Sequence, residues 1–150
     1  MKLKIPHGGV VFVGDGRKAL FLRNDGDEKY PYLKTEKVYL DDNPSTREQG
    51  TARPGRISEA AHGEQRSAVG QTDWHEIEEQ HFARRVAASL EQLIRSSKAR
   101  ALVVVAPPRT LAELRDAFHG DVRALILAEI NKDLTKHPIG EIEKYLTEAA

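Results

Sequence analysis

The sequence predicts an α/β fold with a mixed five-stranded sheet, in which an antiparallel meander is followed by βα units and helices pack on the sheet. Three observations support this. Three short apolar runs separated by turn residues fill the first 40 residues. A long amphipathic helix pattern follows at 73–97. Beyond it, two more apolar runs alternate with helical patterns, which is typical of βα units.

The meander is predicted from apolar runs that flank turn signals. Val10–Val13 and Ala19–Leu22 lie on either side of Gly14-Asp15-Gly16, and an Asp-Gly pair between apolar runs favours a hairpin. A second turn cluster leads to a third strand at Tyr32–Leu40. The residues expected to alternate with inward-facing ones in that strand are Lys34, Glu36 and Tyr39.

Residues 41–72 show no periodicity. They hold one isoleucine, one valine and no aromatic residue, but four glycines and two prolines. Four arginines are set against five acidic residues, so the segment is not a polybasic arm. We expect a long mobile loop within a single domain spanning 1–150.

A long helix is predicted at Asp73–Ser97, where Asp73 and Glu76 have capping-box spacing. Its apolar stripe, which we expect to face the core, consists of Phe82, Val86, Leu90, Leu93 and Ile94. Trp74 and Ile77 lie off this stripe. We therefore expect the first turns to project beyond the sheet, with Trp74 covered by the loop or by a second copy in a homodimer.

The valine-rich run Ala101–Ala106 predicts a strand buried on both faces. Two prolines end it, and a helix is expected to open with Thr110 and Glu113 as a capping box and to close at Gly120. The run Val122–Ile130 predicts a last strand at its centre, although a helix fits the pattern too.

Pro138 is expected to open a final helix, whose apolar side is Ile139, Ile142, Tyr145 and Leu146. Three antiparallel strands followed by two βα units match the layout of a ribonuclease H-like sheet.

Composition excludes several classes of protein. Lysine plus arginine equals aspartate plus glutamate at 23 each, so there is no global positive field to attract nucleic acid, although a local patch would suffice. The absence of cysteine excludes disulfides and thiolate metal sites. No signal peptide and no apolar stretch of about 20 residues is present, which predicts a cytoplasmic protein without membrane insertion.

Polar residues gather at the predicted strand ends. Asp15, Arg109, Lys132 and Asp133 lie at or just beyond them, where α/β sheets form ligand sites. Arg109, near a helix N-terminus, would suit a phosphate or carboxylate. One interpretation is therefore a site for an anion or a nucleotide-like ligand. The other is a structural salt-bridge network, for instance between Arg109 and Asp133.

We expect no metal and no cofactor. A two-metal nuclease needs several clustered carboxylates, and only Asp15, Asp133 and Glu129 are candidates. His75 and Glu79 share a helix face at i, i+4, but His81 lies on another face and cannot join them.

Five segments together resemble a known family. They are Asp15-Gly16-Arg17, Arg53-Pro54-Gly55-Arg56, Glu79-Gln80-His81-Phe82-Ala83, Val105-Ala106-Pro107-Pro108-Arg109 and Asn131-Lys132-Asp133-Leu134-Thr135. Over nearly its whole length the chain resembles the bacterial host-attachment proteins, which are described as required for attachment to host cells. That family is in turn similar to the central, ribonuclease H-like domain of archaeal and eukaryotic release factors.

In release factors a Gly-Gly-Gln loop before a long helix hydrolyses peptidyl-tRNA. Here Val69-Gly70-Gln71 stands at the matching place, with a valine for the first glycine. A β-branched residue resists backbone angles that glycine permits. The resemblance makes Gln71 the candidate catalytic residue. It also makes the helix that follows similar to the basic helix of release factors.

The leading interpretation is a cytoplasmic binding or adaptor module of the host-attachment family, with an unknown protein partner and an indirect role in attachment. The alternative is a ribosome- or tRNA-associated factor that resembles release factors, with ester hydrolysis through Gln71. A metal-dependent nuclease is the third. Candidate ligand-binding residues are Asp15, Arg17, Arg109, Lys132, Asp133 and Thr135. Candidate nucleic-acid-binding residues are Arg53, Arg56, His81, Arg84 and Arg85.

Overall fold

The computed structural model describes residues 2–40 and 67–148, which form a five-stranded mixed sheet in the order β3-β2-β1-β4-β5. The first three strands pair antiparallel, and β1, β4 and β5 run parallel. This ribonuclease H-like arrangement confirms the predicted fold. The strands are β1 Val10–Gly14, β2 Lys18–Asn24, β3 Leu33–Leu40, β4 Leu102–Ala106 and β5 Ile126–Asn131.

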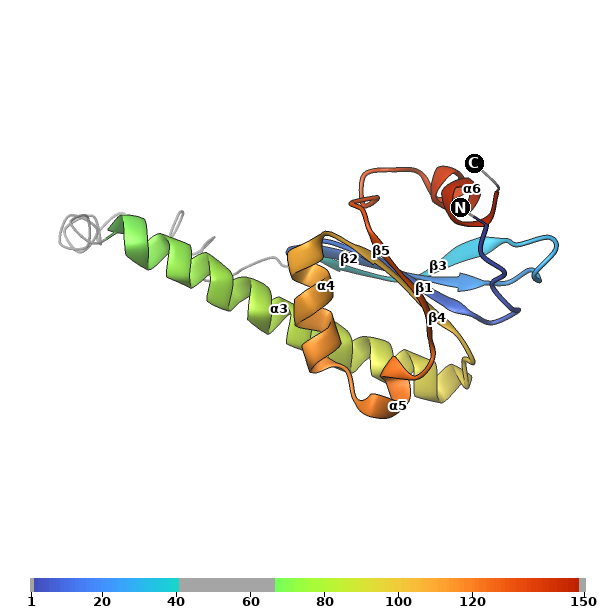
Figure 1. Cartoon of the computed structure of the whole chain (residues 1–150), viewed down its shortest axis with the longest axis horizontal. Coiled ribbons are helices and arrows are strands. Elements are labelled where there is room, and N and C mark those ends of the chain that lie inside the picture. The colour runs from blue at the N-terminus through green and yellow to red at the C-terminus, as the bar shows by residue number, and fades with distance from the viewer. Residues whose placement is uncertain (1, 41–66, 149–150) are drawn as a thin grey trace.

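Helices cover both faces of the sheet (Figure 1). One face carries α3 (Ser67–Ser97), α4 (Pro108–Ala117) and the short α5 (Gly120–Arg123). The opposite face carries α6 (Ile139–Thr147), beside which both ends of the chain lie (Figure 1). No helix in the described part of the chain is long and apolar enough to cross a membrane.

The core is divided by the sheet into two clusters because consecutive strand residues point to opposite faces. In β1, Val10 and Phe12 pack toward α3, whereas Val11 and Val13 pack toward α6. The predicted stripe of α3 is confirmed. Phe82, Val86, Leu90 and Ile94 are buried, and Leu93 packs at the margin of the same cluster.

The start of α3 differs from the prediction. The helix begins at Ser67 rather than Asp73, so Asp73 is not its N-cap and Val69-Gly70-Gln71 is helical rather than part of a loop. Residues 67–72 show no apolar periodicity, but extending an existing helix costs far less than nucleating one. Residues 41–66 of the predicted mobile loop lie outside the described residues.

The 31 residues of α3 span about 46 Å. The helix therefore runs far past the edge of the sheet, as Figure 1 shows. Within α3, no described side chain before Phe82 is buried, in agreement with the expected projection of the first turns.

Two predicted helix caps are wrong. Pro107 occupies the N-cap of α4 and Pro108 the first helical position, so Thr110 lies buried inside the helix and makes no capping box. Proline is well suited to that first position because its missing N–H would have no partner there. Gly120 does not close α4, which ends at Ala117, but begins α5.

The alternation predicted for the third strand is also wrong. Lys34 and Glu36 are exposed as expected, but Tyr39, expected outside, is half-buried. Of the residues expected inside, Leu33 alone is buried in β3. As an edge strand, β3 is covered little by the helices on either side. A register shift opposite Phe21 and Leu22 also leaves Glu36 as an extra residue in the ladder.

A buried asparagine holds the connection between β2 and β3. The Asn24 side-chain amide donates to the Ile5 carbonyl oxygen at 2.8 Å. Its oxygen accepts from the backbone N–H groups of Gly26 at 3.0 Å and Tyr32 at 2.9 Å. One side chain thus joins the N-terminal segment to both ends of the turn.

Candidate functional site

Arg109 sits just past the carboxyl end of β4, at the second residue of α4. Because α4 packs against α3, the guanidinium points across to that helix. Its Nη2 lies 3.0 Å from Glu76 Oε1, and its Nε lies 3.9 Å from Glu79 Oε2 and 3.6 Å from Glu113 Oε1. The anticipated pair between Arg109 and Asp133 is therefore wrong, and the partners of Arg109 are three glutamates.

Negative charge exceeds positive charge in this cluster, since one guanidinium faces three carboxylates. The hydrogen bond to Glu76 raises the pKa of Arg109 above its ordinary value. Burial raises the pKa of the Glu113 carboxyl, and the negative charge of Glu79 raises it further. Arg109 only partly offsets these effects. The described residues contain no group of three or more side chains suited to a metal ion.

The turn between β1 and β2 contacts the cluster of Arg109 and its glutamate partners through Glu79. Asp15 Oδ1 accepts the backbone N–H groups of Arg17 and Lys18, both at 2.7 Å, which closes the turn. A Cβ placed on Gly16 would lie 3.0 Å from Glu79 Cδ. The Asp-Gly-Arg turn, Glu79 and Arg109, which come from three of the five family-like segments, are thereby brought to one edge of the sheet.

The segment after β5 contacts the β1–β2 turn region through a long hydrogen bond from Lys18. Asp133 Oδ1 accepts from the Thr135 hydroxyl at 2.6 Å and from the Thr135 backbone N–H at 3.0 Å, and the hydroxyl bond is the main cause of a lowered Asp133 pKa. Lys18 Nζ donates to the Thr135 carbonyl oxygen at 3.5 Å. Lys132 lies over the Tyr145 ring, toward α6. Asp15 and Asp133 each hold a turn, so we infer structural roles for both.

The basic residues predicted on α3 divide between its two flanks. Arg84 borders a cavity of about 260 Å³ between α3 and α4, which Glu113 and Asp116 also line. Arg85 lies over the Phe82 ring at 5.9 Å, and its charge contributes to a lowered pKa of Tyr39 on β3. His81 is exposed and shares a helix face with Arg85 at i, i+4. Arg84 thus borders an acidic cavity, whereas Arg85 lies on the other flank of α3, toward Tyr39.

Three candidate residues remain without a described side chain. Arg53 and Arg56 lie outside the described residues. The backbone of Gln71 is helical, and its side chain is not among those described.

Sequence reasoning missed the glutamate partners of Arg109 and the residues beside Arg85. The i, i+4 spacing of Arg109 and Glu113 is a usable signal for one ion pair, but Glu113 also fits capping-box spacing with Thr110, which the sequence pattern favours. Glu76 and Glu79 are more than 25 residues from Arg109 in the chain, and only the packing of α4 on α3 brings them together.

Comparison with known families settles the relationship. Residues 9–146 match bacterial archaeo-eukaryotic release factor family 12. The chain belongs to this family. The match supports the release-factor relationship and not the host-attachment name. The comparison with curated proteins gave no match. The release factor family 12 match takes in all five strands, the whole of α3 and the Arg109 cluster.

Proposed function

We propose that this chain is a ribosome- or tRNA-associated factor that contacts RNA phosphates through one flank of α3. Its membership of a release factor family supports this over an adaptor role in host attachment. The observation that carries the proposal is the projection of α3 past the sheet (Figure 1). A helix extended in this way offers a long surface to a large RNA assembly.

His81 and Arg85 are the residues we assign to RNA contact on this helix. Both are exposed, and they lie one turn apart on the flank away from the acidic cavity. Arg84 is left out because Glu113 and Asp116 border the same cavity. Arg53 and Arg56 stay as candidate contacts outside the described residues. Since the chain has no net charge, we expect weak and strongly salt-dependent association.

Ester hydrolysis through Gln71 is the finer form of this hypothesis. Val69, Gly70 and Gln71 lie near the described start of α3, at the end of the helix that is farthest from the sheet (Figure 1). Their helical backbone is unlike the loop that carries Gly-Gly-Gln in release factors. The proposal therefore rests on association, and a single-turnover peptidyl-tRNA release assay with a Gln71→Ala variant tests hydrolysis separately.

A pulldown of the tagged protein from native lysate, with recovered RNA and protein both identified, tests the proposed function. We expect ribosomal RNA or tRNA to be enriched over a mock sample, and the enrichment to be lost in an Arg85→Glu variant. Protein partners that persist after nuclease treatment, without RNA enrichment, would support the adaptor interpretation instead.

A further inference from the structure

A cationic cluster lies where the edge strand β3 meets α3. Lys37 Nζ donates to Ser89 Oγ at 3.2 Å and lies 4.6 Å from the centre of the Tyr39 ring. Ser89 follows Arg85 by four residues, so both lie on the same side of α3. We define the β3–α3 flank as Lys37, Tyr39, Arg85 and Ser89.

The bulge in β3 creates this flank. Before it, Thr35 pairs with Leu22, which belongs to the cluster under α6. After it, Lys37 pairs with Phe21 and Tyr39 with Ala19, both of which face α3. If Glu36 instead paired with Phe21 in a regular ladder, strict alternation would turn Lys37 and Tyr39 to the α6 face. The irregularity thus brings a lysine and a tyrosine beside the basic flank of α3.

The charges of Lys37 and Arg85 both act on the Tyr39 phenol. The pKa of the Tyr39 phenol is lowered, first by its hydrogen bond with Ser89 and further by the hydrogen bond and charge of Lys37 and the charge of Arg85. Glu36, the neighbouring carboxylate on β3, lies 3.6 Å from the guanidinium of Arg23 and is offset by that pair. Two cations and two hydroxyl groups therefore share one small surface.

We propose that the β3–α3 flank binds the phosphate backbone of RNA, which extends the interface assigned to α3 onto the sheet and rests on the proposed function. Lysine and arginine supply charge, and the Tyr39 hydroxyl supplies a donor for phosphate oxygens, while the Ser89 hydroxyl donates to the Tyr39 oxygen. The ring of Tyr39 packs against Phe21, with centroids 5.6 Å apart, and lies beneath Lys37. It is therefore not presented for stacking with a base, and recognition is independent of sequence.

Fluorescence anisotropy with labelled bulk tRNA and with labelled 20-nucleotide poly(U) and poly(A) tests this assignment across a salt series. We expect Lys37→Ala and Arg85→Ala each to weaken binding roughly fivefold and to lower the slope of log K against log salt by about 0.7 to 0.9. Poly(U) and poly(A) should bind with similar affinity. Tyr39→Phe should weaken binding less than Lys37→Ala, because it removes one donor and no charge.

The matched control is Lys34→Ala, since Lys34 is an exposed lysine on the same strand, 3.4 Å from Asp25. It should bind RNA within twofold of wild type, and Lys37→Arg should restore most of the affinity. Melting temperatures measured for all variants separate lost binding from lost folding. Wild-type binding that Lys37→Ala leaves unchanged while Arg85→Ala weakens it, or that Lys34→Ala weakens as much as Lys37→Ala, would overturn the flank alone. Wild-type binding that Arg85→Ala also leaves unchanged would overturn the assignment of Arg85 in the proposed function. Absence of RNA binding by the wild type at any salt concentration would overturn the proposed function as well.

Discussion

Gly16 lies directly against the Glu79 side chain, so that a Cβ on Gly16 would come 3.0 Å from Glu79 Cδ and 3.2 Å from Oε2. This contact joins the β1–β2 turn to α3. It also bears on Arg109, whose Nε lies 3.9 Å from the same Glu79 Oε2. The absence of a side chain at position 16 therefore leaves room for the Glu79 carboxylate beside Arg109.

A Gly16→Ala substitution should displace the Glu79 carboxylate by a few tenths of an ångström. We expect a loss of up to about 1 kcal/mol in the free energy of unfolding. In a Glu79→Ala background the same substitution should be neutral or stabilising, because the clash is gone and alanine restricts the unfolded chain. Urea denaturation of the wild type, the two single variants and the double variant gives the coupling energy, which should be at least about 0.5 kcal/mol. Additive effects would contradict the contact.

A Glu113→Gln substitution should raise the melting temperature at pH 7. Burial raises the pKa of Glu113, so its stability contribution falls as pH rises from the unfolded pKa, near the ordinary value of 4.5, through the higher folded pKa. Glutamine removes that penalty. The difference between variant and wild type should shrink below about pH 4, where the carboxyl is protonated in both states. A lower melting temperature for the variant at pH 7 would mean that the ion pair with Arg109 outweighs burial.

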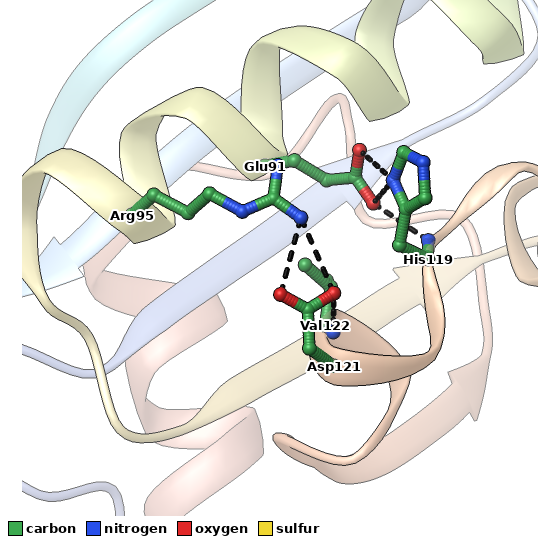
Figure 2. A network of polar contacts seen from close by, with 5 residues as sticks. All are labelled: Glu91, Arg95, His119, Asp121 and Val122. Atoms are coloured by element: carbon green, nitrogen blue, oxygen red, sulfur yellow. Dashed lines mark hydrogen bonds and ion pairs between the residues drawn. The ribbon is translucent and has the colours of Figure 1, made fainter.

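Glu91 on α3 hydrogen-bonds to His119, which lies between α4 and α5 (Figure 2). Its buried carboxylate accepts the His119 backbone N–H at 2.6 Å and lies 2.9 Å from His119 Nδ1, while Arg95 pairs with Asp121 beside it. Glu91→Ala leaves the backbone N–H without this partner and should cost about 2 to 3 kcal/mol in urea denaturation.

The exposed neighbour Gln92 provides the control for Glu91, and Gln92→Ala should stay within about 0.5 kcal/mol of wild type. His119→Ala keeps the backbone bond and should cost less than Glu91→Ala. Equal losses for Glu91→Ala and Gln92→Ala would show that this contact contributes nothing.

Trp74 remains our predicted dimer contact. It is 41% exposed and Ile77 is 44% exposed, so both leave apolar surface that a second copy could bury. Burial of such a side chain is worth about 2 to 3 kcal/mol. Since Trp74 is the single tryptophan, its emission should shift to the blue with rising concentration, and Trp74→Ala should sediment as a monomer. Emission unchanged by dilution together with a monomeric wild-type mass would rule the dimer out.

Most of the sheet could be predicted from the sequence because β1 and β4 are continuous apolar runs and the stripe of α3 has a clear helical period. The burial pattern of the edge strand β3 could not be predicted, since it depends on which part of the sheet the helices cover. The start of α3 was missed because residues 67–72 lack an apolar pattern. Proline at the first turn of α4 prevailed over the Thr110 cap signal.

The candidate site was predicted only in part. The position of Arg109 just past the carboxyl end of β4 was correctly predicted. Its partners Glu76 and Glu79, however, come from α3, which only tertiary packing brings to that end of the sheet. Adjacent arginines suggested one patch, yet on a helix successive residues are about 100° apart, and Arg84 and Arg85 consequently serve different flanks. The bulge that turns Lys37 toward α3 leaves no signal in a single sequence.

Co-sedimentation of the purified chain with purified ribosomes, over a series of salt concentrations, tests the central claim most directly. We predict association at low ionic strength that is lost as salt is added, because phosphate contacts release counterions. Arg85→Ala should weaken it roughly fivefold at each salt concentration, and Lys34→Ala should leave it intact. A chain that never sediments with ribosomes at any ionic strength, or one that sediments independently of salt and of Arg85, would contradict the account.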